Sequence, residues 1–175
     1  MNDSFASLLQ QDHASLDQLL AELDGELLKG NLTRAFELLD LFWARLAIHI
    51  RGENLHLFPA LAGISVDQSD NDLPNSEEIR DVLTKLRSDH NFFMKELALA
   101  IQDMRMMVGQ NSAGKEELEH LRRQLQVLKK RLERHNQLEE ERVYIWPSLL
   151  LDERRLAALA EQLQHELHNL PQRFS

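Results

Sequence analysis

The chain has 175 residues, no cysteine and a formal net charge of −9, from 29 acidic and 20 basic side chains. A chain this acidic is repelled by phosphate backbones and anionic lipid surfaces, which argues against nucleic acid and membrane partners. Without cysteine it can form no disulfide, thiolate ligand or cysteine nucleophile. Its composition, with 43% apolar but only 6% aromatic residues, 6 Gly and 4 Pro, is typical of an all-α protein.

The length favours a single domain, residues 1–175, with a substantial core. The first residues lack the basic stretch and long apolar run of a signal peptide. No segment approaches the roughly 18 uninterrupted apolar residues that a membrane span needs. We therefore expect a soluble, cytoplasmic protein.

Breakers and polar stretches divide the chain into five expected helices. They cover about 4–30, 33–63, 76–109, 115–150 and 152–170. We expect Ser4, Ser76 and Asp152 to cap helices, and Pro59 to kink the second one, while Pro147 lies near the end of the fourth.

Four long helices joined by short or moderate loops favour an antiparallel up-down-up-down four-helix bundle. The longest of these loops is the polar stretch 64–75. The additional short C-terminal helix is expected to pack across the bundle or to mediate a homodimer.

An internal repeat, one helix pair long, is the most informative feature. The first half contains QDH at 11–13 and HIRGENLHLFP at 49–59. The second half contains SDH at 88–90 and HNQLEEERVYIWP at 135–147. Each half therefore reads Asp-His on one helix, His-x-x-x-Glu on the next, and then an aromatic residue and a proline.

The histidines of the repeat lie on the apolar sides of their helices. Leucine and phenylalanine stand three, four or seven residues from each of them, so the imidazoles face the core. Each glutamate follows a histidine by four residues and shares its face. At a rise of about 1.5 Å per residue, all four rings come to a common height of the bundle. The six polar residues are His13, His49, Glu53, His90, His135 and Glu139.

Six polar groups in one layer of a core carry a heavy desolvation penalty unless a cation binds them. A lone core histidine is more often a hydrogen-bonded packing residue than a ligand, but that alternative does not explain six that converge. Imidazole and carboxylate ligands suit iron, manganese or zinc, and a structural zinc site would need only four. The set fits two ions with two terminal histidines each, bridged by Glu53 and Glu139.

These residues resemble the hemerythrin-like, or HHE cation-binding, family, from His13 to about Pro147. The resemblance implies an antiparallel four-helix bundle with a non-haem di-iron centre whose ligands are the six residues above. Members include oxygen carriers, iron and oxygen sensors, and proteins that repair iron–sulfur clusters. We accordingly expect two iron ions as cofactor, and oxygen or nitric oxide as a small-molecule partner.

The second half departs from the family pattern at its proline. Pro147 comes two residues later than Pro59 does in the first half, which makes Glu141 a rival of Glu139. Helix geometry favours Glu139, because a residue at i+4 shares the face of His135 and one at i+6 does not.

The leading functional expectation is a protein that binds or senses oxygen, nitric oxide or iron. The alternatives are a di-iron redox enzyme or iron–sulfur cluster repair protein acting under nitrosative or oxidative stress, and a bundle that metal merely ties together. The cysteine-containing N-terminal segment of many repair members is absent. Met94 stands one turn from His90, where oxygen carriers have a further histidine, which argues against reversible oxygen carriage.

Other polar residues near the motifs are less decisive. His56 could support Glu53 or replace it as a ligand. Asp12 and Asp89 point about 100° from their neighbouring histidines, so we expect them to be exposed. Tyr144, the only tyrosine, is expected to pack, with a hydrogen bond near the site as the alternative. The remaining histidines have no convergent partners: His120, His165 and His168.

Overall fold

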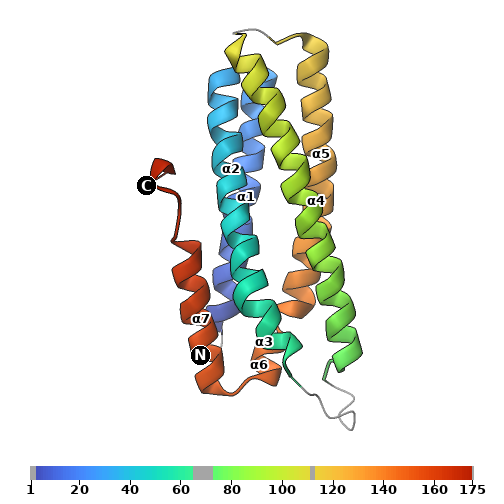
Figure 1. The fold of residues 1–175 in the computed structure, drawn as a ribbon, viewed down its shortest axis with the longest axis vertical. Coiled ribbons are helices and arrows are strands. Elements are labelled where there is room, and N and C mark those ends of the chain that lie inside the picture. Colours follow the sequence, from blue (N-terminus) through green and yellow to red (C-terminus); the bar gives the residue numbers. More distant parts are fainter. Residues whose placement is uncertain (1–2, 65–72, 111–112, 175) are drawn as a thin grey trace.

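The computed structural model describes residues 3–64, 73–110 and 113–174, and they form helices with no strand among them. Four long helices lie side by side in a bundle (Figure 1). They are α1 (Asp3–Lys29), α2 (Leu32–Gly52), α4 (Ser76–Gly109) and α5 (Lys115–Leu138). None of the described helices is both long and apolar enough to cross a membrane.

Two of the long helices continue through a wider turn into a short helix. The π-helical turn η1 (Glu53–Leu57) joins α2 to α3 (Phe58–Ala62). The turn η2 (Glu139–Val143) joins α5 to α6 (Trp146–Leu150). The chain ends with α7 (Glu153–Leu167), which packs along α2 and η1, and a 3₁₀ turn, η3 (Gln172–Phe174).

The bundle core has two apolar parts with a polar layer between them. One cluster fills the end near the α1–α2 connection. It is built from all four long helices and includes Leu16 of α1 and Phe93 of α4. The other lies at the end of α3 and α6 and includes Leu9 and Leu86. His13 and the other five polar residues of this layer lie between the two clusters, so apolar side chains close the layer at both ends.

The expected helix boundaries agree with the structure to within a few residues, but two expected caps are wrong. Asp152 caps α7, with its side chain accepting a hydrogen bond from the Arg155 amide. The cap of α4 is Asn75, one residue before Ser76, because its side chain reaches the third amide of the helix. Ser4 lies within α1. Most of the expected loop at 64–75 lies outside the described residues.

Near Pro59, where a kink is expected, the helix changes type, and this change begins at Glu53. There the Phe58 amide bonds to the Glu53 carbonyl, five residues back instead of four. A proline cannot donate to the preceding turn and its ring presses on that turn's carbonyl. The wider turn η1 ends two residues before Pro59. In the second half η2 ends at Val143, four residues before Pro147.

The helix α7 braces the point where α2 passes into η1. A Cβ atom at Gly52 would lie 3.1 Å from Leu163 Cδ2, so the two helices approach closely there. Arg51 and the buried Glu166 form an ion pair beside this contact. The close contact fixes the start of η1, which carries Glu53.

Replacing Gly52 by alanine tests this contact against a matched position. Gly25→Ala in α1 meets nothing within 4 Å and should raise stability by about 0.5–1 kcal/mol, because alanine is the better helix former. Gly52→Ala gains the same propensity but requires Leu163 to move, and overpacking costs about 1–3 kcal/mol. Its melting temperature should lie clearly below that of Gly25→Ala. Equal increases in both variants would show that the α2–α7 contact is loose.

Candidate metal centre

Two pairs of histidines face each other in the polar layer. In the first pair, His13 Nε2 of α1 lies 3.1 Å from His49 Nε2 of α2. In the second pair, His90 Nε2 of α4 lies 3.2 Å from His135 Nε2 of α5. All four residues are only 2–3% exposed. Two imidazole nitrogens this close repel each other unless a proton or a cation lies between them.

Both glutamates lie between the pairs, fully buried, and each turns one oxygen toward each pair. Glu53 Oε1 is 3.4 Å from His49 Nε2, and its Oε2 is 3.2 Å from His90 Nε2. Glu139 is placed in the same way: its Oε2 is 3.4 Å from His13 Nε2, and its Oε1 is 3.1 Å from His135 Nε2. A carboxylate shared in this way can bridge two cations.

Several atoms of this layer have no hydrogen-bond partner among the described residues. They include Glu53 Oε2, Glu139 Oε1 and His90 Nδ1. A buried polar atom left unpaired costs about 1–3 kcal/mol, and more when it is charged. The two glutamate oxygens point at histidine nitrogens, which is the arrangement that a cation would complete.

The six side chains fall into two groups that could hold a metal ion, with Glu139 common to both. Within each group one nitrogen or oxygen atom from every residue lies within 4.8 Å of the others. The groups are Glu53, His90, His135 and Glu139, and His13, His49 and Glu139. All six predicted residues therefore converge on one place in the core.

The π-helical turns bring one further aromatic residue of each half to this layer. Five residues of α-helix make about 1.4 turns, which would place Phe58 and Tyr144 away from their glutamates. In a π turn the residue at i+5 bonds back to residue i and returns to its face. The Tyr144 amide accordingly donates to the Glu139 carbonyl at 2.8 Å.

The Tyr144 hydroxyl lies inside the site, so this residue forms hydrogen bonds there in addition to the expected packing. It donates to Glu53 Oε1 at 2.7 Å and lies 3.0 Å from His13 Nε2. Burial, followed by the charges of Glu139 and Glu53, raises the pKa of Tyr144 well above its usual value. The phenol is therefore neutral when no cation is present.

The expected exposure of Asp12 is wrong. Its side chain is only 11% exposed and hydrogen-bonds His49 of the neighbouring helix, with Asp12 Oδ2 2.9 Å from Nδ1. Arg45, one turn before His49, donates to the other oxygen at 2.6 Å. The result is a chain from an arginine at the surface through an aspartate to a site histidine.

The second half repeats this chain. Asp89 is buried, with Oδ2 3.4 Å from His135 Nδ1, and Arg131 donates to its Oδ1 at 2.7 Å. In each half, therefore, the histidine of the Asp-His pair faces the site, while the aspartate orients a histidine of the next long helix. The signal in the sequence is an arginine four residues before each His-x-x-x-Glu motif, at Arg45 and Arg131.

Carboxylates control the protonation of the site when it holds no metal. Burial alone would lower the pKa of His49, but the Glu53 charge and the bond to Asp12 outweigh it and raise the pKa well above 6.5. Burial opposes protonation of His135 too, yet Glu139 and Asp89 raise its pKa to about 9. Burial would raise the pKa of Glu53, whereas His49 holds it well below 4.5.

Glu141 and His56, the other possible ligands in the sequence, lie away from the cluster of six residues. Glu141 is exposed and accepts a hydrogen bond from Gln137 at 2.7 Å, while Glu139 faces the site. His56 is about a quarter exposed and turns toward Glu166 of α7, at 4.0 Å, outside both groups of metal-binding type. It therefore lies beside the brace of η1 and not beside the carboxylate of Glu53.

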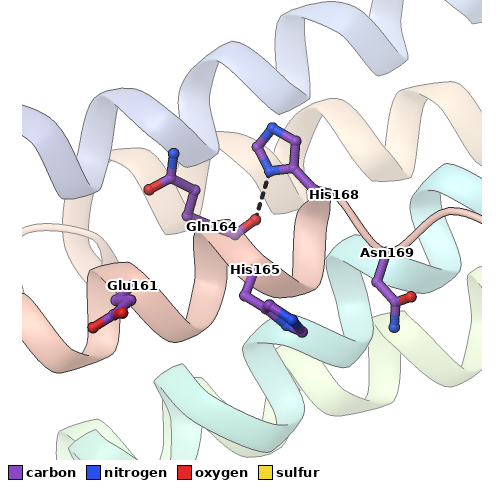
Figure 2. A pocket seen from close by; sticks show the side chains of 5 residues that line it. All are labelled: Glu161, Gln164, His165, His168 and Asn169. Atoms are coloured by element: carbon purple, nitrogen blue, oxygen red, sulfur yellow. Dashed lines mark hydrogen bonds between the residues drawn. The ribbon is translucent and has the colours of Figure 1, made fainter.

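The surface pocket along α7 gathers two of the remaining histidines. Figure 2 shows His165 and His168 pointing in different directions, with Glu161 further along the helix. The His168 ring is held by the Gln164 carbonyl, 2.6 Å from Nδ1. These side chains do not converge on a common point, as a metal site would require.

Comparison with known families agrees with this geometry. The family model described as the hemerythrin HHE cation-binding domain matches residues 4–147. The chain belongs to this family. No curated protein and no solved structure matches it. The HHE match spans both halves of the repeat, and the buried histidine and glutamate groups suit the metal cation that such domains bind. The match ends at residue 147, so α7, which braces η1, lies beyond the matched residues.

Removing the charge of Asp12 or Asp89 should weaken cation binding while leaving the site side chains in place. Partners that orient metal-binding histidines typically account for 10–100-fold in affinity, so Asp12→Asn and Asp89→Asn should each raise the iron(II) dissociation constant by about that factor. Competition with a coloured chelator measures it. Asp81→Asn is the matched control, since that side chain is 71% exposed. Affinities equal to the control would show that the two aspartates do not act on the site.

The metal-free protein should lose stability as pH rises. The folded pKa of His135 is about 9, above its usual 6.5, so its stabilising contribution is complete below about pH 6.5 and lost on passing about pH 9. Thermal unfolding of chelator-treated protein should show this fall, and His135→Gln should reduce it. His165→Gln, at the surface, should keep the slope of the parent. A melting temperature that does not change over this range would contradict the predicted protonation.

Proposed function

We propose that this HHE domain is a non-haem di-iron protein that binds or senses a small ligand such as oxygen or nitric oxide, or reports iron supply. The observation that carries the proposal is the division of each buried carboxylate between the two histidine pairs. One ion would be held by the first pair and the other by the second. Glu53 and Glu139 would bridge them.

The donor set suits iron and argues against a structural zinc site. Imidazole and carboxylate together suit iron, manganese and zinc, and cysteine, which structural zinc sites often use, is absent. Two ions sharing two carboxylates require the closely spaced double site that these residues build. A pair of iron ions would supply one-electron redox chemistry and open coordination positions for a small ligand.

The protein side chains would orient the histidine rings, keep water out of the layer and limit the size of the ligand that reaches it. Asp12 and Asp89 hold the rings of His49 and His135 through Nδ1, which leaves Nε2 free to face the cation. The apolar clusters on both sides keep water out of the layer. Since the six residues are 0–3% exposed, only a ligand of very few atoms could reach them, which supports a diatomic partner.

The proposal also takes the four long helices to alternate in direction, as in an up-down-up-down bundle. Support comes from the connections, because only Gly30 and Asn31 separate α1 from α2, and the two helices pack together. Gly30, with φ of 73°, adopts the left-handed conformation that lets the chain reverse there.

Metal analysis of protein purified without chelators tests the ligand assignment. The parent should contain about two irons per chain, as expected of a two-metal site. His49→Ala and His135→Ala each remove one member of a pair and should lower the iron content, while His165→Ala should not. Unchanged iron in both site variants, or zinc alone in the parent, would contradict the proposal.

Mixing the reduced, iron-loaded protein with oxygen, nitric oxide or peroxide distinguishes the functions. A stable and reversible change of the visible spectrum is expected if the protein binds or senses the ligand. Repeated consumption of the added molecule would indicate a di-iron enzyme instead. No spectral change with any of them would leave the metal a purely structural role and overturn the proposal.

A further inference from the structure

Phe58 and Tyr144 occupy equivalent places in the two halves. Each stands nine residues after the histidine of its motif and directly follows a π turn. The Phe58 ring stacks on His90 with centroids 5.5 Å apart, and the Tyr144 ring lies 5.5 Å from His13. Because both rings pack against the layer at the same distance, ring packing alone does not require the hydroxyl of Tyr144.

That hydroxyl lies among the donor atoms of the first histidine pair. It is 2.7 Å from Glu53 Oε1 and 3.3 Å from Glu139 Oε2. It is also 3.0 Å from His13 Nε2 and 3.4 Å from His49 Nε2. A phenol has one proton and can donate to one of these atoms. The remaining atoms need further protons or a metal cation among them, because carboxylate oxygens and unprotonated ring nitrogens can only accept hydrogen bonds.

The two candidate metal positions differ in the donors that they gather. Around the second pair, both glutamates and both histidines offer atoms within 4.8 Å of one another. Around the first pair only Glu139 joins the histidines in that way. The Tyr144 oxygen lies between Glu53 and this smaller group, where it would add a further donor.

We infer that the Tyr144 oxygen is a ligand of the ion held by His13 and His49, which makes the two metal positions chemically different. The inference rests on the proposed di-iron function. On binding iron(III), the phenol O–H bond breaks, the oxygen bonds to the ion, and the proton is released to solvent, as for other protonated ligand groups. The ion beside Phe58 has no such ligand.

A second difference between the halves points the same way. His13 Nδ1 lies 2.8 Å from a carboxylate oxygen of Glu140, whereas His90 Nδ1 has no hydrogen-bond partner among the described residues. The counterpart of Glu140 in the first half is Asn54, a neutral amide. The first position therefore has a negative charge behind its histidine as well as the phenol oxygen. Both favour the more highly charged ion there.

Spectroscopy of the iron(III) form tests the inference. The metal-free chain is loaded with iron(II) without oxygen, its iron is counted, and it is oxidised with ferricyanide. The parent should show a phenolate-to-iron(III) absorption band and, in resonance Raman spectra, tyrosinate vibrations. Since Tyr144 is the only tyrosine, these signals can have no other source in the chain. Zinc-loaded protein should lack them.

The decisive variant is Tyr144→Phe, which copies the residue found in the other half. It should keep iron near the parent level, because both histidine pairs and both glutamates remain, and lose the band and the vibrations completely. Phe5→Leu is the matched control, since it trims a ring packed at 6.5 Å from the Tyr144 ring and leaves the hydroxyl in place. It should keep both signals.

Two failures can be told apart. An oxidised parent that holds two irons but lacks tyrosinate signals, or a Tyr144→Phe protein that retains the band, would overturn this inference and leave the di-iron function standing. A parent that takes up no iron would remove the di-iron function and the ligand role of Tyr144 together.

Discussion

The burial of two carboxylates and four imidazoles in one layer of the bundle is the constraint on which the rest of the structure depends. Apolar clusters close the layer on both sides, so water cannot satisfy its polar atoms. Without metal, the neighbouring carboxylates raise the pKa of His49 and His135, and the protons that these rings keep offset part of the negative charge. Glu53 Oε2 and Glu139 Oε1 still lack a hydrogen bond from any residue that the structure describes, and a cation would satisfy both.

The repeat explains how one chain builds two similar histidine pairs. In each half an arginine and an aspartate orient a histidine, and a π turn begins at the glutamate. The halves differ at single equivalent positions, such as Phe58 in the first half and Tyr144 in the second. If each half holds one ion, as proposed, the duplicated arrangement gives the two ions similar histidine pairs but different neighbouring aromatic residues.

Much of the site follows from the sequence because side chains on one helix have a fixed spacing. The leucine stripes placed four histidines and two glutamates on core-facing sides, and equal distances from the turns brought them to one height. The same rule separated Glu139 from Glu141. The helix boundaries followed from glycine, proline and polar breakers, apart from the cap of α4, which is Asn75 instead of Ser76.

The missed features depend on relations between helices or on the backbone itself. Asp12 points away from His13 along its own helix, yet it meets His49 on the next, which spacing within one helix cannot show. Tyr144 reaches the site only because a π turn replaces α-helical geometry at Glu139. The brace by Leu163 and Glu166 arises from packing of a helix beyond the HHE match.

Anomalous diffraction at the iron absorption edge, from crystals of iron-loaded protein, tests the central claim most directly. Two peaks should appear about 3.5–4 Å apart, as is usual for two-metal sites, one beside each histidine pair and with Glu53 and Glu139 between them. A single peak, or iron bound only outside this layer, would contradict the claim that the two halves hold one ion each.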